Sequence, residues 1–412
     1  MSPTLKAALI TFIAATITFL TVLLSELIGE NPGLVLRGST NEVLGFRLTP
    51  KVCDDSAETF LISQTVTTEP SYEGARVGAW DDGLTKGCST EKEVWVDYKI
   101  TQTAGDHLIT ILGHNVSLKV YNYTMPDQPS LPLLVQMQPW DYHKSINDFD
   151  QRDKGYLDVF QALIDHRITP YKTWVTRTNL DETFDLDLPI TIVPVTTRNP
   201  HSDPELVALN NRCSGRRCVA YLHDEPRESD YPSIDALAAR LKAYPNIKSM
   251  VTEKYTEAMP NVDIFTEVLH PNFVSGRASM YYVSCMSHGC GPQVGTSSGA
   301  PDFVLDRDPI YSRVFLWVAY FGNIQAILYY NSVEGLSQTV YLFTGNRDGQ
   351  LLYGPGFKQQ SLRLKYLRRG SYDYEYLKAA RADISSLVRS PFDWEKDEQK
   401  YDDLIRQIGG SF

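Results

Sequence analysis

The sequence predicts an α/β protein in which a (β/α)8 TIM barrel follows an N-terminal β-sandwich and a single N-terminal hydrophobic helix. Three observations predict this order. An uncharged apolar run extends from Ala7 to Leu24, stretches of alternating polarity fill residues 36–130, and short apolar segments separated by helical or loop segments follow Pro132. The first pattern is typical of a membrane or export segment, the second of sheets with one buried face, and the third of a parallel barrel.

Length and charge restrict the classes of function. The 412 residues are 42% hydrophobic, enough for one large domain with a smaller one, and the formal net charge is -11 without any long Lys or Arg run. Nucleic acid requires a basic footprint on its partner, so the chain is not expected to bind it. An uncharged ligand such as a sugar suits this composition better.

Residues 1–30 form the predicted signal anchor or signal peptide. The apolar run after Lys6 exceeds a usual signal-peptide core, and no small-x-small cleavage site follows it. This favours an uncleaved anchor over a cleaved peptide, with the membrane as partner of this segment and the rest of the chain facing the lumen or the outside, or secreted. Two glycosylation sequons, beginning at Asn115 and Asn122, agree with export.

Six cysteines suit the same compartment. Cys213 and Cys218 are close in sequence, as are Cys285 and Cys290, so local disulfides are expected, which leaves Cys53 with Cys88. A rival interpretation takes Cys285, His288 and Cys290 as zinc ligands. No second ligand pair with zinc-site spacing is evident, so no metal is predicted.

Alternating stretches at 94–100 and 118–123, separated by Gly, Asn and Asp turns, predict the β-sandwich of residues 36–130. The barrel is expected over 131–385 and a C-terminal helical tail over 386–412. Helices are expected at 156–165, 234–243 and 311–321. Eight barrel strands are expected at 133–137, 171–174, 190–195, 218–222, 247–251, 262–266, 280–284 and 326–330.

Asp224 and Glu225 are the candidate catalytic residues. They follow the fourth predicted strand in the segment from Tyr221 to Pro226, and working residues of a βα barrel lie at the carboxyl ends of its strands. Two adjacent carboxylates beside a core can have one pKa raised, which makes a proton donor at neutral pH. The plainer alternative is an exposed acidic turn.

The seventh predicted strand lacks a carboxylate that could act as nucleophile. A glycosidase can dispense with a protein nucleophile when the 2-acetamido group of the substrate attacks the anomeric carbon. Glu225 would then protonate the leaving oxygen and later activate water, while Asp224 would orient the acetamide N–H and stabilise the positive intermediate. Alternatively, Glu225 works with Glu253, which follows the fifth strand.

Other polar and aromatic residues near strand ends are candidates for substrate binding. The aromatic side chains could instead close the top of the barrel, and the histidines could be hydrogen-bonded structural residues. Asp141 and Glu267 are further polar candidates of lower rank. The candidate substrate-binding residues are Trp140, Tyr142, His143, Trp174, His223, Glu253, Tyr282, Tyr330 and Asn331.

Several segments resemble glycoside hydrolase family 123, the β-N-acetylgalactosaminidases, and relatives that share its C-terminal catalytic-like domain. His223 to Pro226 is similar to the family's catalytic Asp-Glu pair, and residues 123–132 are similar to its junction between sandwich and barrel. Residues 313–317 and 326–331 resemble the helix and strand that close the barrel. The most specific similarity covers 348–356, 361–364 and 367–377. This last region is expected to be structural, with a helix starting at Tyr372.

The resemblance implies a retaining, substrate-assisted glycosidase that removes terminal β-linked N-acetylgalactosamine, or another N-acetylhexosamine, from glycans or glycolipids. Hydrolysis of this kind needs only water, so no cofactor is expected. The chain departs from the family pattern at Tyr330, where a Trp is usual, and at Gly354, which is an extra glycine. Two alternatives stay open: a glycosidase acting on a sugar without an acetamido group, and a catalytically silent carbohydrate-binding protein of the cell surface.

Overall fold

A computed structural model describes most of the chain after the N-terminal segment. The described residues are 33–72, 74–137, 152–171, 184–198, 201–269, 280–284, 300–333, 341–342 and 345–412. The predicted signal anchor within residues 1–30 lies outside them. Within the described ranges no helix is both long and apolar enough to cross a membrane.

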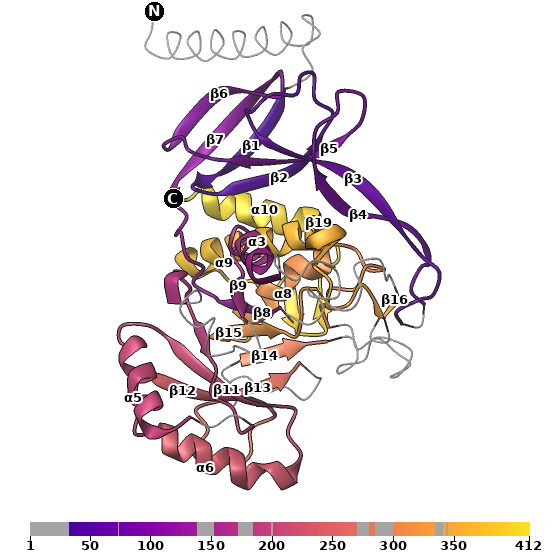
Figure 1. The fold of residues 1–412 in the computed structure, drawn as a ribbon. Helices are drawn as coiled ribbons and strands as arrows, with labels where there is room; N and C mark the ends of the chain where they lie inside the picture. Colours follow the sequence, from indigo (N-terminus) through magenta and orange to yellow (C-terminus); the bar gives the residue numbers. More distant parts are fainter. Residues whose placement is uncertain are drawn as a thin grey trace, which may run out of the picture.

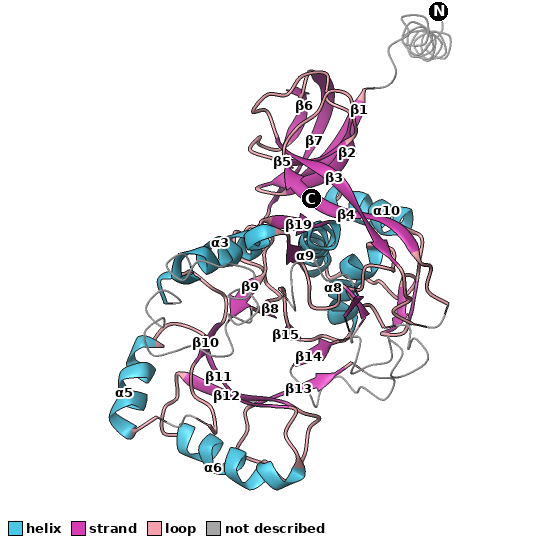
Figure 2. Cartoon of the chain, turned by 45° about the vertical axis from the view of Figure 1, so that its right-hand side comes forward, coloured by secondary structure: helices cyan, strands magenta, loops and turns pink. Residues whose placement is uncertain are grey.

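Eight parallel strands form a nearly closed barrel, which confirms the predicted strand count and barrel. Neighbours in the sheet follow the order β10-β11-β12-β13-β14-β15-β8-β9, so the first barrel strand pairs with the last. Among the described residues, β9 and β10 are the two edge strands of this sheet. The strand labels in Figure 2 follow one another around a ring. The strands are β8 (Leu133–Gln136), β9 (Thr169–Tyr171), β10 (Thr191–Val193), β11 (Cys218–Asp224), β12 (Ile247–Thr252), β13 (Ile264–Val268), β14 (Met280–Val283) and β15 (Ala326–Tyr329).

Four described helices connect barrel strands. They are α3 (Arg152–Ile164), α5 (Asp203–Arg212), α6 (Tyr231–Leu241) and α8 (Ile310–Phe321). Helix α6 buries Ile234, Leu237, Ala238 and Leu241, the i, i+3, i+4, i+7 spacing of a helix with one apolar face. Residues 253–263, between β12 and β13, contain turns and no helix, so the strict alternation of strand and helix fails there. Pro260, which cannot donate a helical hydrogen bond, lies in this connection.

Alternate residues of the strands fill the barrel interior. Tyr221, Met250, Met280 and Tyr282 belong to one buried cluster, while Val251 and Phe265 face a different cluster outside the sheet. Because the side chains of a strand alternate between faces, this division identifies the inward-facing positions. The barrel is therefore a packed core, and a ligand can bind only at one of its ends.

Antiparallel pairing dominates the two sheets of the N-terminal part (Figure 1). Val94 and Val96 of one sheet share a core with Val116, Leu118 and Val120 of the other. The smaller sheet contains β1 (Leu34–Thr40), β7 (His114–Thr124) and β6 (Gly105–Ile111). The larger contains β2 (Val43–Leu48), β5 (Val94–Lys99), β3 (Glu58–Thr67), β4 (Gly78–Lys86), β19 (Gln359–Ser361) and β18 (Leu352–Tyr353).

The strands β18 and β19 come from the C-terminal part of the chain, after the barrel. β19 pairs antiparallel with β4 through Gln360 opposite Leu84 and Ser361 opposite Gly83. The sequence pattern of residues 36–130 gave no sign of this extension. A disulfide between Cys53, before β3, and Cys88, after β4, links the two ends of this hairpin.

Two of the three predicted disulfides are confirmed. Cys53 bonds Cys88 across 35 residues, and Cys213 bonds Cys218 across five. Cys285 and Cys290 lie outside the described residues. Disulfides persist in oxidising compartments, so this is an extracellular or lumenal protein. The sequon residues Asn115 and Asn122 are both exposed on β7, where a glycan could be attached.

Helix α9 (Leu362–Ala380) lies between the N-terminal sheets and the barrel (Figure 1). The expected start at Tyr372 is wrong, because the hydroxyl of Ser361 accepts a hydrogen bond from Leu364 N and caps the helix ten residues earlier. Leu364, Leu367 and Tyr376 of this helix belong to the main core.

Charged residues of α9 are buried with partners from distant parts of the chain. Lys365 and Arg368 bind the two carboxylate oxygens of Asp97 on β5, at 2.6 and 2.5 Å, while Arg363 binds Asp82 of β4 at 3.1 Å. Burial alone would raise the pKa of Asp97, but the charges of Arg368 and Lys365 outweigh it and lower that pKa. These pairs attach the helix to the N-terminal sheet.

Asp373 of α9 faces the other way. It accepts bonds from Arg313 Nε at 2.6 Å and from the Trp317 indole N–H at 2.9 Å, and both donors belong to the barrel helix α8. Arg313 also binds Asp402 of α10 (Glu398–Gly409) at 2.6 Å. Helix α9 thus bonds the sheets on one side and the barrel on the other.

Glu42 is a buried carboxyl between β1 and α9. Its Oε2 accepts bonds from the Tyr376 hydroxyl at 2.6 Å and from Ser39 N at 2.9 Å. Burial raises the pKa of Glu42 to about 7 from 4.5, although these two bonds and the charge of Arg369 act in the opposite direction and Asp373 adds to the rise. Over the pH range between these two pKa values, Glu42 is therefore protonated in the folded protein and deprotonated in the unfolded chain.

This pKa predicts a pH-dependent effect of Glu42→Gln. Between pH 4.5 and 7 the folded protein binds the extra proton, so its unfolding free energy falls as pH rises through that window. Glutamine mimics the protonated form and accepts the same bonds. The variant should match the wild type near pH 4 and exceed its unfolding free energy by on the order of 3 kcal/mol at pH 8.

Urea denaturation at both pH values measures this difference. Exposed Glu91 provides the control, since Glu91→Gln should shift stability equally at the two pH values. A Glu42→Gln variant that gained nothing at pH 8 would contradict the assignment of a protonated Glu42.

Candidate active site

A cavity of about 110 Å³ opens at the carboxyl end of the barrel. Its walls come from strands β8, β9, β11, β12, β14 and β15 or from the residues that follow them. This is the end where working residues of βα barrels lie. The lining residues are Gln136, Tyr171, Tyr221, Asp224, Glu225, Thr252, Tyr282, Ser284, Leu328 and Tyr330.

A β-bulge in β11 directs Asp224 into this cavity. Tyr221 is opposite Met250 and His223 is opposite Val251, so Leu222 is an extra residue in the strand. Strict alternation would place Tyr221 and Asp224 on opposite faces of the sheet. The extra residue reverses the alternation, and both side chains face the barrel interior.

Glu225 enters the same cavity through an unusual backbone conformation. Its φ is 40°, in the left-handed region that residues other than glycine rarely adopt, and Pro226 follows. Such a conformation costs roughly 1–3 kcal/mol and persists where surrounding contacts enforce it. One contact is visible: Glu225 N donates to Thr252 Oγ1 at 2.8 Å. The bulge and this turn together bring two consecutive carboxylates to one cavity.

Two hydroxyl groups hold Asp224. Its Oδ1 accepts bonds from the Tyr221 hydroxyl at 2.7 Å and from Thr252 Oγ1 at 2.8 Å. Thr252 ends β12 directly opposite Asp224, so its side chain faces the same side of the sheet. The Thr252 hydroxyl therefore bonds both acids, one through its carboxylate and the other through its backbone.

Glu225 has a different partner. The Tyr282 hydroxyl donates to its Oε1 at 2.6 Å from β14, across the cavity. Burial, then the bond to Glu225 and the charges of Glu225, Asp224 and Glu253, raise the pKa of Tyr282. Burial and the charge of Asp224 also raise the pKa values of Tyr221 and Tyr171. All three phenols stay protonated and act as donors, so the two acids have distinct environments suited to distinct roles.

Among the expected substrate-binding residues, Tyr282 and Tyr330 line the cavity with the two acids. Tyr330 also contacts the Tyr329 ring edge-on, with centroids 5.3 Å apart. His223 is displaced by the bulge to the position opposite outward-facing Val251, and its Nδ1 lies 2.9 Å from Asp224 O. It does not line the cavity.

Three other expected candidates lie away from the cavity walls. Glu253 Oε1 accepts a bond from Lys254 N at 2.8 Å, and its charge acts on Tyr231 of α6. Asn331 is fully buried, and its Oδ1 accepts bonds from Ser332 N and Val333 N, as in an Asx turn. Glu267 is opposite outward-facing Tyr281 and so faces away from the barrel interior.

Trp140, Asp141, Tyr142, His143 and Trp174 lie outside the described residues, as do Cys285, His288 and Cys290 of the zinc alternative. In the part of the chain that the structure describes, no group of three or more His, Cys, Asp or Glu side chains could hold a metal ion.

Five polar residues of the cavity wall were not among the candidates predicted from the sequence: Gln136, Tyr171, Tyr221, Thr252 and Ser284. One signal could have found most of them. Gln136, Tyr171 and Thr252 are the last residues of β8, β9 and β12, and Ser284 directly follows β14. A polar residue at the carboxyl end of an apolar strand is a site candidate even when it is uncharged. Tyr221 lies inside β11, three residues before its end, and carries no such signal.

No protein-family model matches the chain, and no curated protein is significantly similar to it.

The bonds of Thr252 predict a specific loss of stability. Thr252→Val removes a donor from Asp224 and leaves Glu225 N–H without its acceptor, which should lower the unfolding free energy by about 1–3 kcal/mol. Thr252→Ser keeps the hydroxyl and should lose less.

Thr266 offers a matched control, because its buried hydroxyl has no hydrogen-bond partner among the described residues. Thr266→Val should therefore be neutral or stabilising in the same urea titration. Equal effects of the two valine substitutions would show that the Thr252 bonds contribute nothing.

Proposed function

We propose that the chain is a glycoside hydrolase that removes terminal β-linked N-acetylgalactosamine, or another N-acetylhexosamine, from glycans or glycolipids by a retaining, substrate-assisted mechanism. The observation that carries this proposal is the presence of Asp224 and Glu225 in one cavity at the carboxyl end of the barrel. Among the described residues that line it, these two are the only carboxylates. The resemblance of residues 223–226 to the catalytic pair of glycoside hydrolase family 123 supports the same assignment.

In the first step, the acetamide oxygen of the substrate attacks the anomeric carbon while Glu225 gives a proton to the departing glycosidic oxygen. Tyr282 donates to Glu225 Oε1 and so holds this carboxyl in position for the proton transfer. Asp224 accepts the acetamide N–H and stabilises the positive oxazolinium-like intermediate. The hydroxyls of Tyr221 and Thr252 hold its other oxygen, Oδ1, in place.

In the second step, water attacks the anomeric carbon and Glu225 takes up the proton of that water. The acetamide oxygen leaves, and the sugar retains its original configuration. Glu225 thus acts first as acid and then as base, while Asp224 serves the acetamide group of the substrate. Tyr171, Tyr282 and Tyr330 supply aromatic surface around the cavity for contact with a sugar ring.

The alternative that pairs Glu225 with Glu253 has less support. A nucleophile or base must reach the anomeric carbon, yet Glu253 does not line the cavity and is bonded to Lys254 N. A catalytically silent binding protein would have no need for a strained Glu225 directed into a cavity beside Asp224. For localisation, we propose that residues 1–30 anchor the enzyme in a membrane with its barrel in the lumen or outside.

Substitution of the proposed acid tests the chemistry. Glu225→Gln cannot donate a proton, so turnover of an aryl β-N-acetylgalactosaminide should fall by roughly 10²–10⁴-fold. Glu253→Gln is the matched control and should retain most activity. Unchanged turnover in Glu225→Gln would refute its role, and a comparable loss in Glu253→Gln would favour the alternative pair.

A panel of chromogenic glycosides with and without the 2-acetamido group tests the mechanism. The wild type should hydrolyse only acetamido sugars, because the substrate supplies the nucleophile. Asp224→Asn should impair that hydrolysis strongly, since it removes the charge that stabilises the intermediate. A trapped covalent glycosyl-enzyme would contradict substrate assistance, and binding without turnover across the panel would favour a silent protein.

A further inference from the structure

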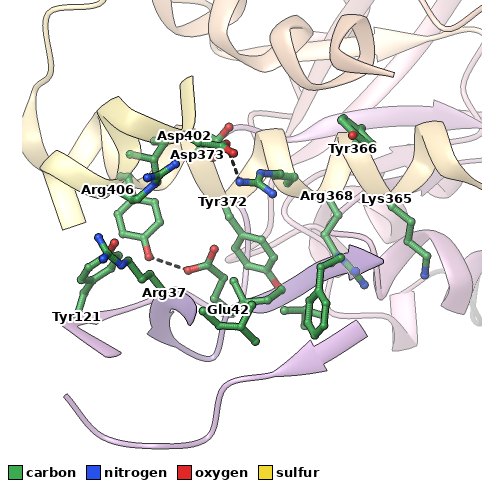
Figure 3. Close-up of a pocket in the computed structure, with 18 of the residues that line it drawn as sticks. Arg37, Glu42, Tyr121, Lys365, Tyr366, Arg368, Tyr372, Asp373, Asp402 and Arg406 are labelled. Carbon is green, nitrogen blue, oxygen red and sulfur yellow. Dashed lines mark hydrogen bonds and ion pairs between the residues drawn. The ribbon is translucent and has the colours of Figure 1, made fainter. Parts of the chain in front are cut away.

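A second and larger cavity, of about 540 Å³, lies between the N-terminal sheets and the helices α9 and α10 (Figure 3). It is separate from the barrel site: its walls come from β1, β2, β5, β7, α9 and α10, and it shares no residue with the smaller cavity. Its volume falls in the range of small-molecule sites and accommodates one or two sugar rings.

One buried polar group in this cavity has no partner. The Tyr121 ring on β7 is 5% exposed, and its hydroxyl makes no hydrogen bond within the part of the chain that the structure describes. Native proteins satisfy almost all buried polar atoms, so an orphaned hydroxyl in a cavity wall indicates a ligand or water that would bond to it.

Two guanidinium groups lie beside this hydroxyl. Figure 3 shows Arg37 of β1 next to Tyr121, and the charge of Arg406 of α10 also acts on Tyr121. Burial raises the pKa of Tyr121, the charge of Glu42 adds to that rise, and the charges of Arg37 and Arg406 oppose it. Arg37 has no ion pair among the described residues, and Arg406 has an exposed pair with Asp403 at 3.1 Å. An exposed pair of this kind contributes little, so both cations are open to an anion.

The other cations named here have carboxylate partners within the folded chain. Arg369 binds Asp402 at 2.6 Å, and Lys365 and Arg368 share Asp97. Two cations without a buried carboxylate partner, Arg37 and Arg406, therefore lie at the end of the cavity where Tyr121 is. Away from that end, Trp95, Tyr366 and Tyr372 present aromatic surface.

We propose that this cavity binds an acidic saccharide, with its carboxylate or sulfate at Tyr121, Arg37 and Arg406 and its ring against the aromatic wall. Guanidinium forks match the two oxygens of such a group, and the phenol adds a third donor. The aromatic faces suit the apolar face of a sugar ring. The site would capture acidic glycans apart from the barrel cavity, and it requires no catalysis.

Calorimetric titration of the folded protein tests the proposal. Glucuronate and a sulfated hexosamine should each bind saturably, whereas neutral N-acetylgalactosamine should not bind to this cavity. Arg37→Gln and Arg406→Gln should each weaken binding by about tenfold, and Tyr121→Phe by about fivefold. Arg37→Lys should restore part of the loss, and thermal unfolding of each variant verifies that it is folded.

This binding test does not depend on the proposed hydrolysis. Glu225→Gln should bind the acidic sugars as tightly as the wild type does, because Glu225 lies in the other cavity. Loss of that binding in Glu225→Gln would place the ligand in the barrel and overturn the proposal. Saturable binding of inorganic phosphate as tight as that of the acidic sugars would also overturn it, as would equal binding by wild type and Arg37→Gln. The absence of any saturable binding would do the same.

Discussion

The burial of the charged helix α9 is the constraint on which the arrangement of the whole chain depends. A buried charge without a partner costs several kcal/mol, so each of its buried charges must meet an opposite charge. Arg363, Lys365 and Arg368 find theirs on the N-terminal sheet, and Asp373 finds its partner on α8. The sheets and the barrel are thus fixed to each other by paired charges as well as by apolar packing.

This rigid support matters because the barrel site depends on local strain. An extra residue in β11 and a left-handed backbone at Glu225 bring two adjacent acids to one side of a strand, which regular pleating forbids. Thr252 and Tyr282, from two other strands, keep the two acids in this arrangement through hydrogen bonds. Strain of this kind persists only where neighbours overdetermine the geometry.

Sequence patterns predicted the eight strands, three of the helices and the position of Asp224 and Glu225, because apolar runs and strand ends are local features. They could not reveal the bulge at Leu222, which depends on pairing with β12 and which places His223 opposite outward-facing Val251. Asn331 looked like a strand-end candidate, but it bonds its own following backbone. The ion pairs of α9 join residues too distant in sequence for any local pattern to link them.

The extension of the N-terminal sheet by β18 and β19 has a consequence for synthesis of the chain. Strand β4 emerges from the ribosome long before its neighbour β19, with the entire barrel sequence between them. Until Gln359 to Ser361 arrive, the backbone groups of that edge lack their partners, and Asp82 lacks Arg363. An open strand edge can pair with other chains. The N-terminal sheet of this protein therefore needs protection during synthesis until β19 has been made.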